Sequence, residues 1–179
     1  MIKQFHGVEK VNLKTISLKQ EIIKIFKKFG LSNNHALISA NAIINAELVG
    51  APGHGLSRLN MYCKRISKKV INSKPKIRIK KITQSISLVD ADNCIGFVAA
   101  DIAIKKAIKN AKKTGIGMVA VKNSGHYGLS GYYAEQAVKK NLITMIYTSA
   151  PPAVAPYGSS KSLFGTNPIC FGTPTGSKI

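Results

Sequence analysis

The chain has 179 residues, 45% of them apolar, with 15 Gly and 7 Pro, which is enough for one domain of ordinary size. This composition excludes a disordered, collagenous or low-complexity chain. No apolar run approaches the roughly 18 residues of a membrane-spanning helix, and residues 1–11 lack the apolar region of a signal peptide. We therefore expect a globular, cytoplasmic protein without a membrane partner.

The net charge is +20, from 27 Lys plus Arg against 7 Asp plus Glu. The densest basic stretch, residues 64–81, has no acidic residue and would suit a lysine-rich module that binds nucleic acid through its phosphates. However, only three basic residues are arginines (Arg58, Arg65 and Arg78), and no aromatic residue is interleaved after Tyr62. We favour a solvated lysine-rich surface, with the nucleic-acid-binding module as the alternative.

The three cysteines, Cys63, Cys94 and Cys170, are odd in number and widely separated. None belongs to a CxxC pair, so the spacing predicts neither a disulfide framework nor a zinc site. We expect three buried, reduced thiols and no bound metal.

Two amphipathic helices are predicted at the start of the chain. Ser17 and Gln20 have the spacing of a capping box, and apolar residues then recur at helical intervals until Gly30, which supplies a C-cap. Ser32 can cap a second helix, whose apolar stripe stops at Gly50.

A loop and a strand pair follow these helices. Residues 51–55 contain one Pro and two Gly and break the helical pattern, and apolar residues at helical spacing then indicate a third helix over residues 56–70. The period changes to two after Pro75, which predicts strands over residues 77–82 and 85–89 that form a hairpin or strand pair.

Helices and strands alternate in the next part of the chain. Residues 97–114 return to helical spacing and end at Gly115, and residues 116–121 form an unbroken apolar run that indicates a buried strand. Ser130 can cap a helix over residues 130–140, and residues 142–148 are a second buried-strand candidate.

This alternation predicts an α/β fold. We expect a helical N-terminal segment, residues 1–75, and a partial α/β domain, residues 76–179, with a mixed sheet and flanking helices. From Ala150 onward charge almost disappears while Pro and Gly recur, which indicates extended, loop-rich chain.

A first candidate site is His54-Gly55-x-x-Arg58, with Tyr62 one helical turn beyond Arg58. An imidazole, a guanidinium and a phenol could converge there on a small anion. Such a set suits a 2-oxo or 2-hydroxy acid, because Arg holds a carboxylate and His transfers a proton to or from oxygen. Spacing alone leaves open a loop histidine satisfied by backbone and a surface arginine.

Two further segments could bind a ligand. The glycine-rich residues 123–131 lie between a predicted strand and a helix, where free amides attract anionic groups, but they do not match G-x-G-x-x-G, so the Rossmann fingerprint fails. The turn Thr166-Asn167-Pro168 exposes a hydroxyl and an amide that could orient a polar substrate or a nicotinamide carboxamide. The alternatives are a glycine-rich turn without a ligand in the first segment and ordinary Asn-Pro turn chemistry in the second.

Three enzyme classes are excluded by missing motifs. Serine hydrolases need a G-x-S-x-G elbow and phosphoryl-transfer enzymes a P-loop, and the chain has neither. Glycosidases need paired carboxylates, and among the seven acids only Asp90 and Asp92 cluster in a predicted loop.

Taken together, five segments in the same order resemble the malate/L-lactate dehydrogenase family, which has a non-Rossmann nicotinamide fold and includes ureidoglycolate and sulfolactate dehydrogenases and cyclic-imine reductases. The segments are His54-Gly55-x-x-Arg58-x-x-x-Tyr62, Leu88-Val89-Asp90-x-Asp92-Asn93, Asn123-Ser124-x-His126-Tyr127-Gly128, Val154-Ala155-Pro156-x-Gly158 and Gly165-Thr166-Asn167-Pro168. The resemblance spans essentially the whole chain.

The resemblance implies hydride transfer between NAD or NADP and a small 2-oxo or 2-hydroxy acid, in a homodimer. It implies that His54, His126 and Arg58 are catalytic, that Arg58, Tyr62 and Thr166 bind substrate, and that Tyr127, Gly128, Leu129, Ser130, Gly131 and Asn167 bind the cofactor.

The chain departs from the family in two respects. Gly53 stands where the family usually has Ser or Thr, which removes a hydroxyl able to orient the imidazole of His54. Family chains also run to about twice this length, and their later half supplies an acidic partner for that histidine. We therefore expect an incomplete fold with uncovered sheet faces, poor solubility and little activity for the chain alone. A non-catalytic remnant is the remaining alternative.

Overall fold

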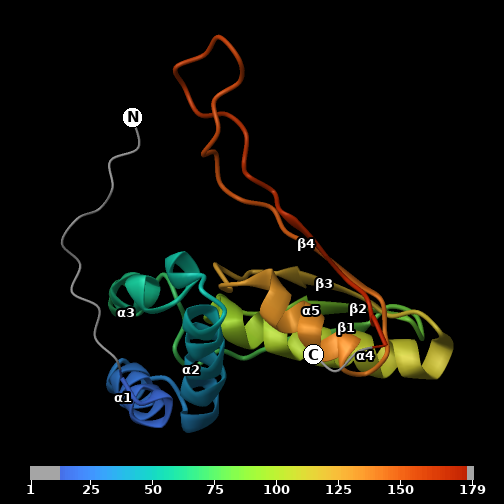
Figure 1. Cartoon of the computed structure of the whole chain (residues 1–179), viewed down its shortest axis with the longest axis horizontal. Coiled ribbons are helices and arrows are strands. Elements are labelled where there is room, and N and C mark those ends of the chain that lie inside the picture. Colours follow the sequence, from blue (N-terminus) through green and yellow to red (C-terminus); the bar gives the residue numbers. More distant parts are fainter. Residues whose placement is uncertain (1–12, 177–179) are drawn as a thin grey trace.

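The computed structural model describes residues 13–176 (Figure 1). Within this range no helix is both long and apolar enough to cross a membrane. The expectation for residues 1–11 lies outside the described residues, as do residues 177–179. The described chain has a mixed α/β architecture, in agreement with the predicted fold class.

The chain opens with α1 (Thr15–Lys28) and α2 (Asn33–Leu48), which pack against each other. The second cap is confirmed, because Ser32 Oγ accepts a hydrogen bond of 3.2 Å from the backbone N–H of His35. The capping box at Ser17 is wrong, because α1 already begins at Thr15 and its N-cap, Lys14, makes no side-chain cap.

The third helix is shorter than the predicted residues 56–70. Two single turns of 3-10 helix, η1 (Pro52–His54) and η2 (Leu56–Arg58), precede α3 (Leu59–Ser67). Pro52 and the two glycines of this loop tighten the chain before the α-helix can start. As a result Arg58 lies at the N-terminal boundary of α3, and Val70 lies beyond its end.

The predicted strand pair is confirmed as β1 (Arg78–Lys81) and β2 (Ile86–Asp90), which run antiparallel. Next, α4 (Gly96–Thr114) crosses over to β3 (Met118–Lys122), which pairs parallel with β2. The sheet order is therefore β1-β2-β3, and the sheet is mixed as predicted. Gly115 ends α4 in the left-handed conformation, as expected.

The prediction that residues 116–121 form a buried strand is wrong in its burial. β3 has β2 as its single described neighbour, and four of its five residues are exposed, with Met118 at 59%. The apolar run indicated a strand covered on both faces, but nothing within residues 13–176 covers its outer edge.

The last elements are α5 (Ser130–Val138), β4 (Thr144–Tyr147) and β5 (Ile169–Gly172). β4 and β5 form their own antiparallel sheet, so residues 142–148 give a half-exposed strand outside the first sheet instead of the predicted buried one. α5 ends at Val138 instead of 140, and Ser130 makes no cap because its hydroxyl pairs with Tyr127 Oη at 2.9 Å.

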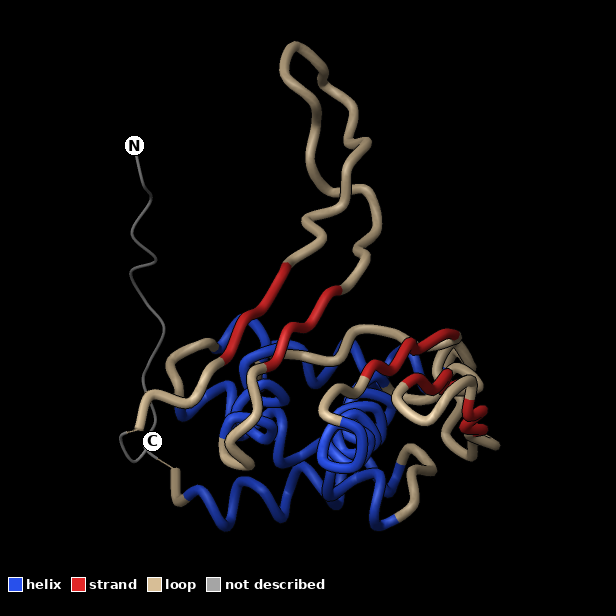
Figure 2. Tube along the Cα trace, turned by 90° about the vertical axis from the view of Figure 1, so that its right-hand side faces the viewer, coloured by secondary structure: helices blue, strands red, loops and turns tan. Residues whose placement is uncertain are grey.

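Residues 148–168, between β4 and β5, form an arm that projects away from the helices (Figures 1 and 2). Its two sides meet in one antiparallel bridge, between Val154 and Phe164. The arm and the two strands below it carry several exposed apolar side chains: Met145, Tyr147, Val154, Tyr157, Leu163, Phe164, Ile169 and Phe171. This surface matches the expectation of uncovered sheet faces.

The main core joins the N-terminal helices to α4. Phe26 of α1, Ile43 of α2, Tyr62 of α3 and Phe97 of α4 are all at most 1% exposed and belong to one cluster. Because this cluster fixes α3 against the start of α4, it also fixes the side chains that face the loop after β3.

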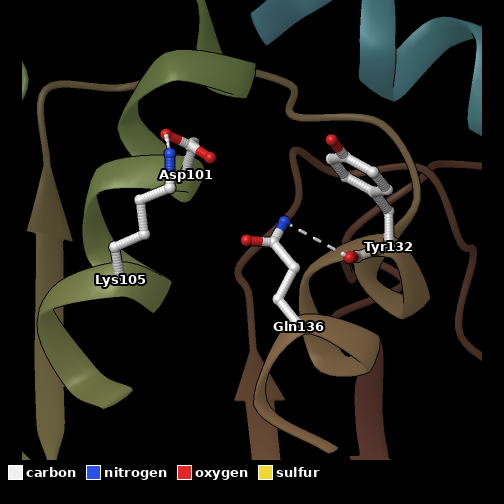
Figure 3. A network of polar contacts seen from close by, with 4 residues as sticks. All are labelled: Asp101, Lys105, Tyr132 and Gln136. Carbon is white, nitrogen blue, oxygen red and sulfur yellow. Dashed lines mark hydrogen bonds and ion pairs between the residues drawn. The ribbon is translucent and has the colours of Figure 1, made fainter. Parts of the chain in front are cut away.

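α4 and α5 pack against each other, and each helix carries one polar pair of its own (Figure 3). Each pair stays within one helix: Lys105 pairs with the largely buried carboxylate of Asp101 at 2.7 Å, and Gln136 Nε2 donates to the Tyr132 carbonyl at 3.4 Å. The thiols of Cys63 and Cys94 are free and buried as expected, whereas Cys170 in β5 is free but only partly buried, which corrects that prediction.

Candidate functional site

The loop that carries His54 is held by a carboxylate from α2. Glu47 Oε1 accepts a hydrogen bond of 2.7 Å from the backbone N–H of Leu56. A Cβ on Gly55 would lie 2.8 Å from Glu47 Cδ and closer still to Oε1, so only glycine leaves room for this contact. A side chain at position 55 would therefore displace Glu47 from the Leu56 N–H.

Arg58 folds back toward the same loop. Its Nε donates a hydrogen bond of 2.8 Å to the carbonyl of Gly53, one residue before His54. The guanidinium is exposed, and its charge reaches both Tyr62 and His126. The structure thus brings together the His54, Arg58 and Tyr62 set that the spacing suggested.

His126 comes to this set from the loop after β3. The rings of His54 and His126 stack with centroids 5.6 Å apart and an interplanar angle of 9°. Tyr62 Oη lies 2.6 Å from His126 Nδ1, and the Tyr62 ring packs on Phe97 with centroids 4.9 Å apart. Two candidate segments, 64 residues apart in sequence, therefore form one site.

The loop that carries His126 is tied to the end of β2. Asp90 Oδ1 accepts from Asn123 Nδ2 at 2.9 Å, and the backbone N–H of Asn93 donates to the Asn123 carbonyl at 2.8 Å. At the start of α4, a Cβ on Gly96 would lie 2.6 Å from the His126 carbonyl carbon, so the loop sits directly on the glycine backbone. The carboxyl ends of parallel strands β2 and β3 thus present His126, at an edge where α/β proteins commonly bind ligands.

Asp92 has a structural position in this arrangement. Its Oδ2 accepts from Asn72 Nδ2 at 2.9 Å and from the backbone N–H of Lys76 at 2.8 Å. The two acids of the Asp90-x-Asp92 segment therefore hold the surrounding loops in place.

A cavity of about 320 Å³ opens beside Tyr62 and His126. It is lined by Tyr62, Arg65, Val70, Ile71, Asn93, Cys94, Gly96, Ser124, Gly125 and His126. His54 and Arg58 are not among its lining residues, whereas Arg65 is, although sequence reasoning singled out Arg58. The spacing of three between Tyr62 and Arg65 on one helix was the signal that could have found it.

Charge and burial keep His126 neutral near pH 7. Burial, followed by the positive charges of Arg58, His54 and Arg65, lowers the pKa of His126 to about 4. Burial also raises the pKa of Tyr62 well above its usual range, so its phenol keeps its hydrogen. Burial raises the pKa of Cys94 in the cavity wall to about 11, so this thiol is protonated and a poor nucleophile.

His54 has an unmet hydrogen-bonding requirement. Its Nδ1 is the one side-chain polar atom within residues 13–176 that is buried without a hydrogen-bond partner. A buried polar atom of this kind is costly unless another group satisfies it.

The segment from Tyr127 to Gly131 makes internal contacts. Tyr127 Oη and Ser130 Oγ are 2.9 Å apart, and Tyr133 Oη donates to the Tyr127 carbonyl at 2.9 Å. Gly128 has φ +82° and no room for a Cβ beside Phe97, whereas the nearest atom to a Cβ on Gly131 would be Leu129 Cγ at 3.9 Å. The side chains are thus engaged within the protein, and open backbone remains at Gly131.

Thr166 and Asn167 lie in the projecting arm. Asn167 Oδ1 accepts a hydrogen bond of 2.8 Å from the backbone N–H of Ala150, across the arm. No hydrogen bond or ring contact links either residue to the histidine pair within the described chain. Residues 13–176 contain no group of three or more His, Cys, Asp or Glu placed to hold a metal ion.

Comparison with known proteins identifies the family. Residues 13–179 match the family model described as Malate/L-lactate dehydrogenase, and the chain belongs to this family. The Malate/(S)-sulfolactate dehydrogenase of Methanothermus fervidus is 39% identical over 154 residues, which cover 86% of this chain and 45% of that protein. The L-sulfolactate dehydrogenase of Methanocaldococcus jannaschii is 38% identical over 89% of this chain and 46% of its own length.

Solved structures of dehydrogenases also resemble the fold of this chain. The malate dehydrogenase of Pyrococcus horikoshii OT3 superposes with a TM-score of 0.89 at 38% identity, over 94% of this chain and 48% of that one. The names of further relatives, each 34% identical, specify either NAD(+) or NADP(+). The chain spans about half the length of the curated relatives it matches. Family membership favours the dehydrogenase interpretation over the nucleic-acid-binding module.

Proposed function

We propose that this chain carries the substrate-binding and proton-transfer part of an NAD(P)-dependent oxidoreductase that interconverts a small 2-oxo acid and its 2-hydroxy acid. The observation that carries this proposal is the clustering of His54 and Arg58 with Tyr62 and His126, the last two of which line the cavity. Relatives named as malate and sulfolactate dehydrogenases support it.

In this proposal Arg58 holds the substrate carboxylate. Its guanidinium is exposed, its Nε donates to the Gly53 carbonyl, and one terminal nitrogen makes only a weak contact of 4.0 Å with Met61 Sδ, which a planar carboxylate would replace. His54 exchanges a proton with the substrate oxygen. The unpartnered Nδ1 of His54 is where an acidic group from a later segment, which the resemblance implies, would bond and orient the ring.

The residues present fit the reacting end of a nicotinamide cofactor, which supplies or accepts a hydride when bound. A Cβ on Gly125 would meet nothing within 4 Å, so a flat ring can approach the backbone of the cavity wall there. Ser124, Gly125 and His126 would hold this end. In this proposal Tyr127 to Gly131 and Asn167 contact the cofactor, and Thr166 contacts the substrate.

We further propose that the working enzyme is a cytoplasmic homodimer. In it, polypeptide other than residues 13–176 of the same subunit covers the apolar surfaces of β3, β4 and β5. The exposed side chains of these strands, among them Met118 and Phe171, support this. The division at residue 75 into a helical segment and an α/β domain also stays a proposal.

The test is a chimera in which residues 13–176 replace the matching half of the Pyrococcus horikoshii malate dehydrogenase. We expect it to oxidise NADH or NADPH with a 2-oxo acid such as oxaloacetate or sulfopyruvate, followed by absorbance. Arg58→Ala should raise KM and lower kcat, and His54→Ala should remove turnover while sparing folding. Arg78→Ala, on β1, is the matched control and should change neither constant.

A folded chimera that turns over normally with both Arg58→Ala and His54→Ala would refute these assignments. We also expect the 179-residue chain by itself to show little activity, so robust NADH oxidation by the purified chain would contradict that expectation.

A further inference from the structure

The hydrogen bonds around His126 decide which of its ring nitrogens carries the hydrogen. Nδ1 lies 2.6 Å from Tyr62 Oη and 3.3 Å from the backbone nitrogen of Gly128. A backbone N–H can only donate, so Nδ1 must accept. A hydroxyl can donate or accept, and beside a nitrogen that accepts it must donate. Tyr62 and Gly128 therefore both donate to Nδ1.

The hydrogen of a neutral ring then belongs to Nε2, because a neutral imidazole has one donor and one acceptor nitrogen. His126 Nε2 makes no hydrogen bond within residues 13–176, yet the buried unpartnered polar atom of that range is His54 Nδ1 alone. Nε2 is therefore open to solvent, in a residue that lines the cavity.

The charged and titratable groups around His126 favour the same neutral form. They are Arg58 from η2, His54 from η1, and Arg65 and Tyr62 from α3. The charges that shift its pKa all come from basic side chains, which oppose a second proton on the ring.

We propose that Tyr62 is a positioning residue which, with the Gly128 amide, fixes His126 as the neutral Nε2–H tautomer, so that His126 offers the substrate oxygen a hydrogen-bond donor and does not act as a base. This inference rests on the proposed function and deepens it. Tyr62 then acts through His126, and this indirect role replaces the direct substrate contact that the family resemblance implied.

The proton balance of the reduction follows from this assignment. A hydride adds to the carbonyl carbon of the 2-oxo acid, and the electrons of the C=O π bond move to oxygen. His126 Nε2–H stabilises the charge that develops there without losing its hydrogen. The oxygen would take its proton from the cationic form of His54, which would end neutral, and a reduced nicotinamide cofactor, when bound, would supply the hydride and be oxidised.

The test is nitrogen NMR of the 15N-labelled 179-residue chain at pH 7, with His126→Gln to assign the signals. Two-bond proton–nitrogen correlations report which ring nitrogen is protonated. We expect protonated Nε2 and unprotonated Nδ1 for His126. A spectrum dominated by the Nδ1–H form overturns the proposal, and this result needs no variant of Tyr62 to fold.

Tyr62→Phe tests the role of the hydroxyl. The variant leaves the Gly128 amide alone on Nδ1, so a detectable share of the Nδ1–H form should appear and the pKa of His126 should rise by roughly half a unit to one unit. Tyr133→Phe is the control, since Tyr133 is equally buried at 1% exposure and also loses a hydroxyl hydrogen bond.

Tyr133→Phe should leave the tautomer and pKa of His126 unchanged. Equal shifts in both variants, or no shift in either, would overturn the role of Tyr62. The NMR readouts require neither substrate nor cofactor. An inactive chimera would therefore count against the proposed function, while the His126 spectrum still decides this inference.

Discussion

Gly96 is the position where the smallest added group should do the most damage to the site. It begins α4, and a Cβ there would lie 2.6 Å from the His126 carbonyl carbon and closer to the carbonyl oxygens of Gly125 and His126. These are backbone atoms, which cannot rotate away. Ordinary contact begins near 3.4 Å and the nearest carbonyl oxygens would lie at 2.4 Å, so Gly96→Ala must push the loop away by about 1 Å.

The energetic balance favours destabilisation. Overpacking of this kind costs typically about 1–3 kcal/mol, and backbone on the receiving side places the cost near the upper end. Alanine gains less than about 1 kcal/mol over glycine from helix propensity. The net loss of about 2 kcal/mol should lower Tm by about 4–8 °C for a chain of this size.

The displacement should also reach the chemistry of the site. A retreat of about 1 Å away from α4 can stretch the Tyr62 to His126 hydrogen bond from 2.6 Å to about 3.6 Å, beyond the limit of a useful bond. Urea unfolding measures the stability and His126 ring shifts measure the geometry. Gly125→Ala is the control in the same loop, since its Cβ would meet nothing within 4 Å. Equal stability and unchanged His126 shifts in Gly96→Ala would refute the reasoning.

Three further outcomes are expected. The pKa of His126 is about 4 in the folded chain against 6.5 for the free side chain, so the unfolded chain binds the proton first and stability should fall as pH drops from about 6.5 to 4. Urea midpoints of His126→Gln should lack this pH dependence, and parallel pH profiles of the two proteins would contradict the prediction. Gly55→Ala and Glu47→Ala should each lower the free energy of unfolding by about 1–3 kcal/mol, because either change leaves the Leu56 N–H without its acceptor. In a double-mutant cycle measured by denaturant unfolding, the double variant should lose clearly less than the sum, and strict additivity would contradict the contact. Phe26→Ala, at 0% exposure, should cost about 3–5 kcal/mol, while Phe171→Ala, at 60%, should stay within about 0.5 kcal/mol; similar unfolding midpoints for the two would mean that the core is misidentified.

Local signals in the sequence predicted most of the helices and the strand pair. The Ser32 cap and the Gly115 terminus depend on neighbouring residues alone, so short motifs sufficed to find them. Ser17 and Ser130 fit the same kind of motif but failed. In α1 the chain entered the helix earlier, and at α5 the competing partner was Tyr127.

Strand burial could not be predicted in the same way. An apolar run such as residues 116–121 indicates a strand that is covered on both faces, but it does not indicate which segment covers it. Within residues 13–176, β3 is left at an edge, and β4 pairs with β5 in a second sheet. Pairing between distant strands depends on the whole fold, which periodicity does not record.

The candidate site shows the same division. Spacing grouped His54, Arg58 and Tyr62, because they lie within nine residues of one another. It could not show that His126 stacks on His54 and bonds to Tyr62. Those relations arise because the shared core presses α3 against the start of α4.

The bond between Tyr62 and His126 also has a kinetic consequence, because it closes a loop of 64 residues. Bringing such distant residues together has an entropic cost that must be met before the contact can contribute, so β2, α4 and β3 have to be ordered first. The histidine pair should assemble among the last events of folding. A chain that has formed its helices but not its parallel strand pair would be partly folded and would lack the assembled histidine pair.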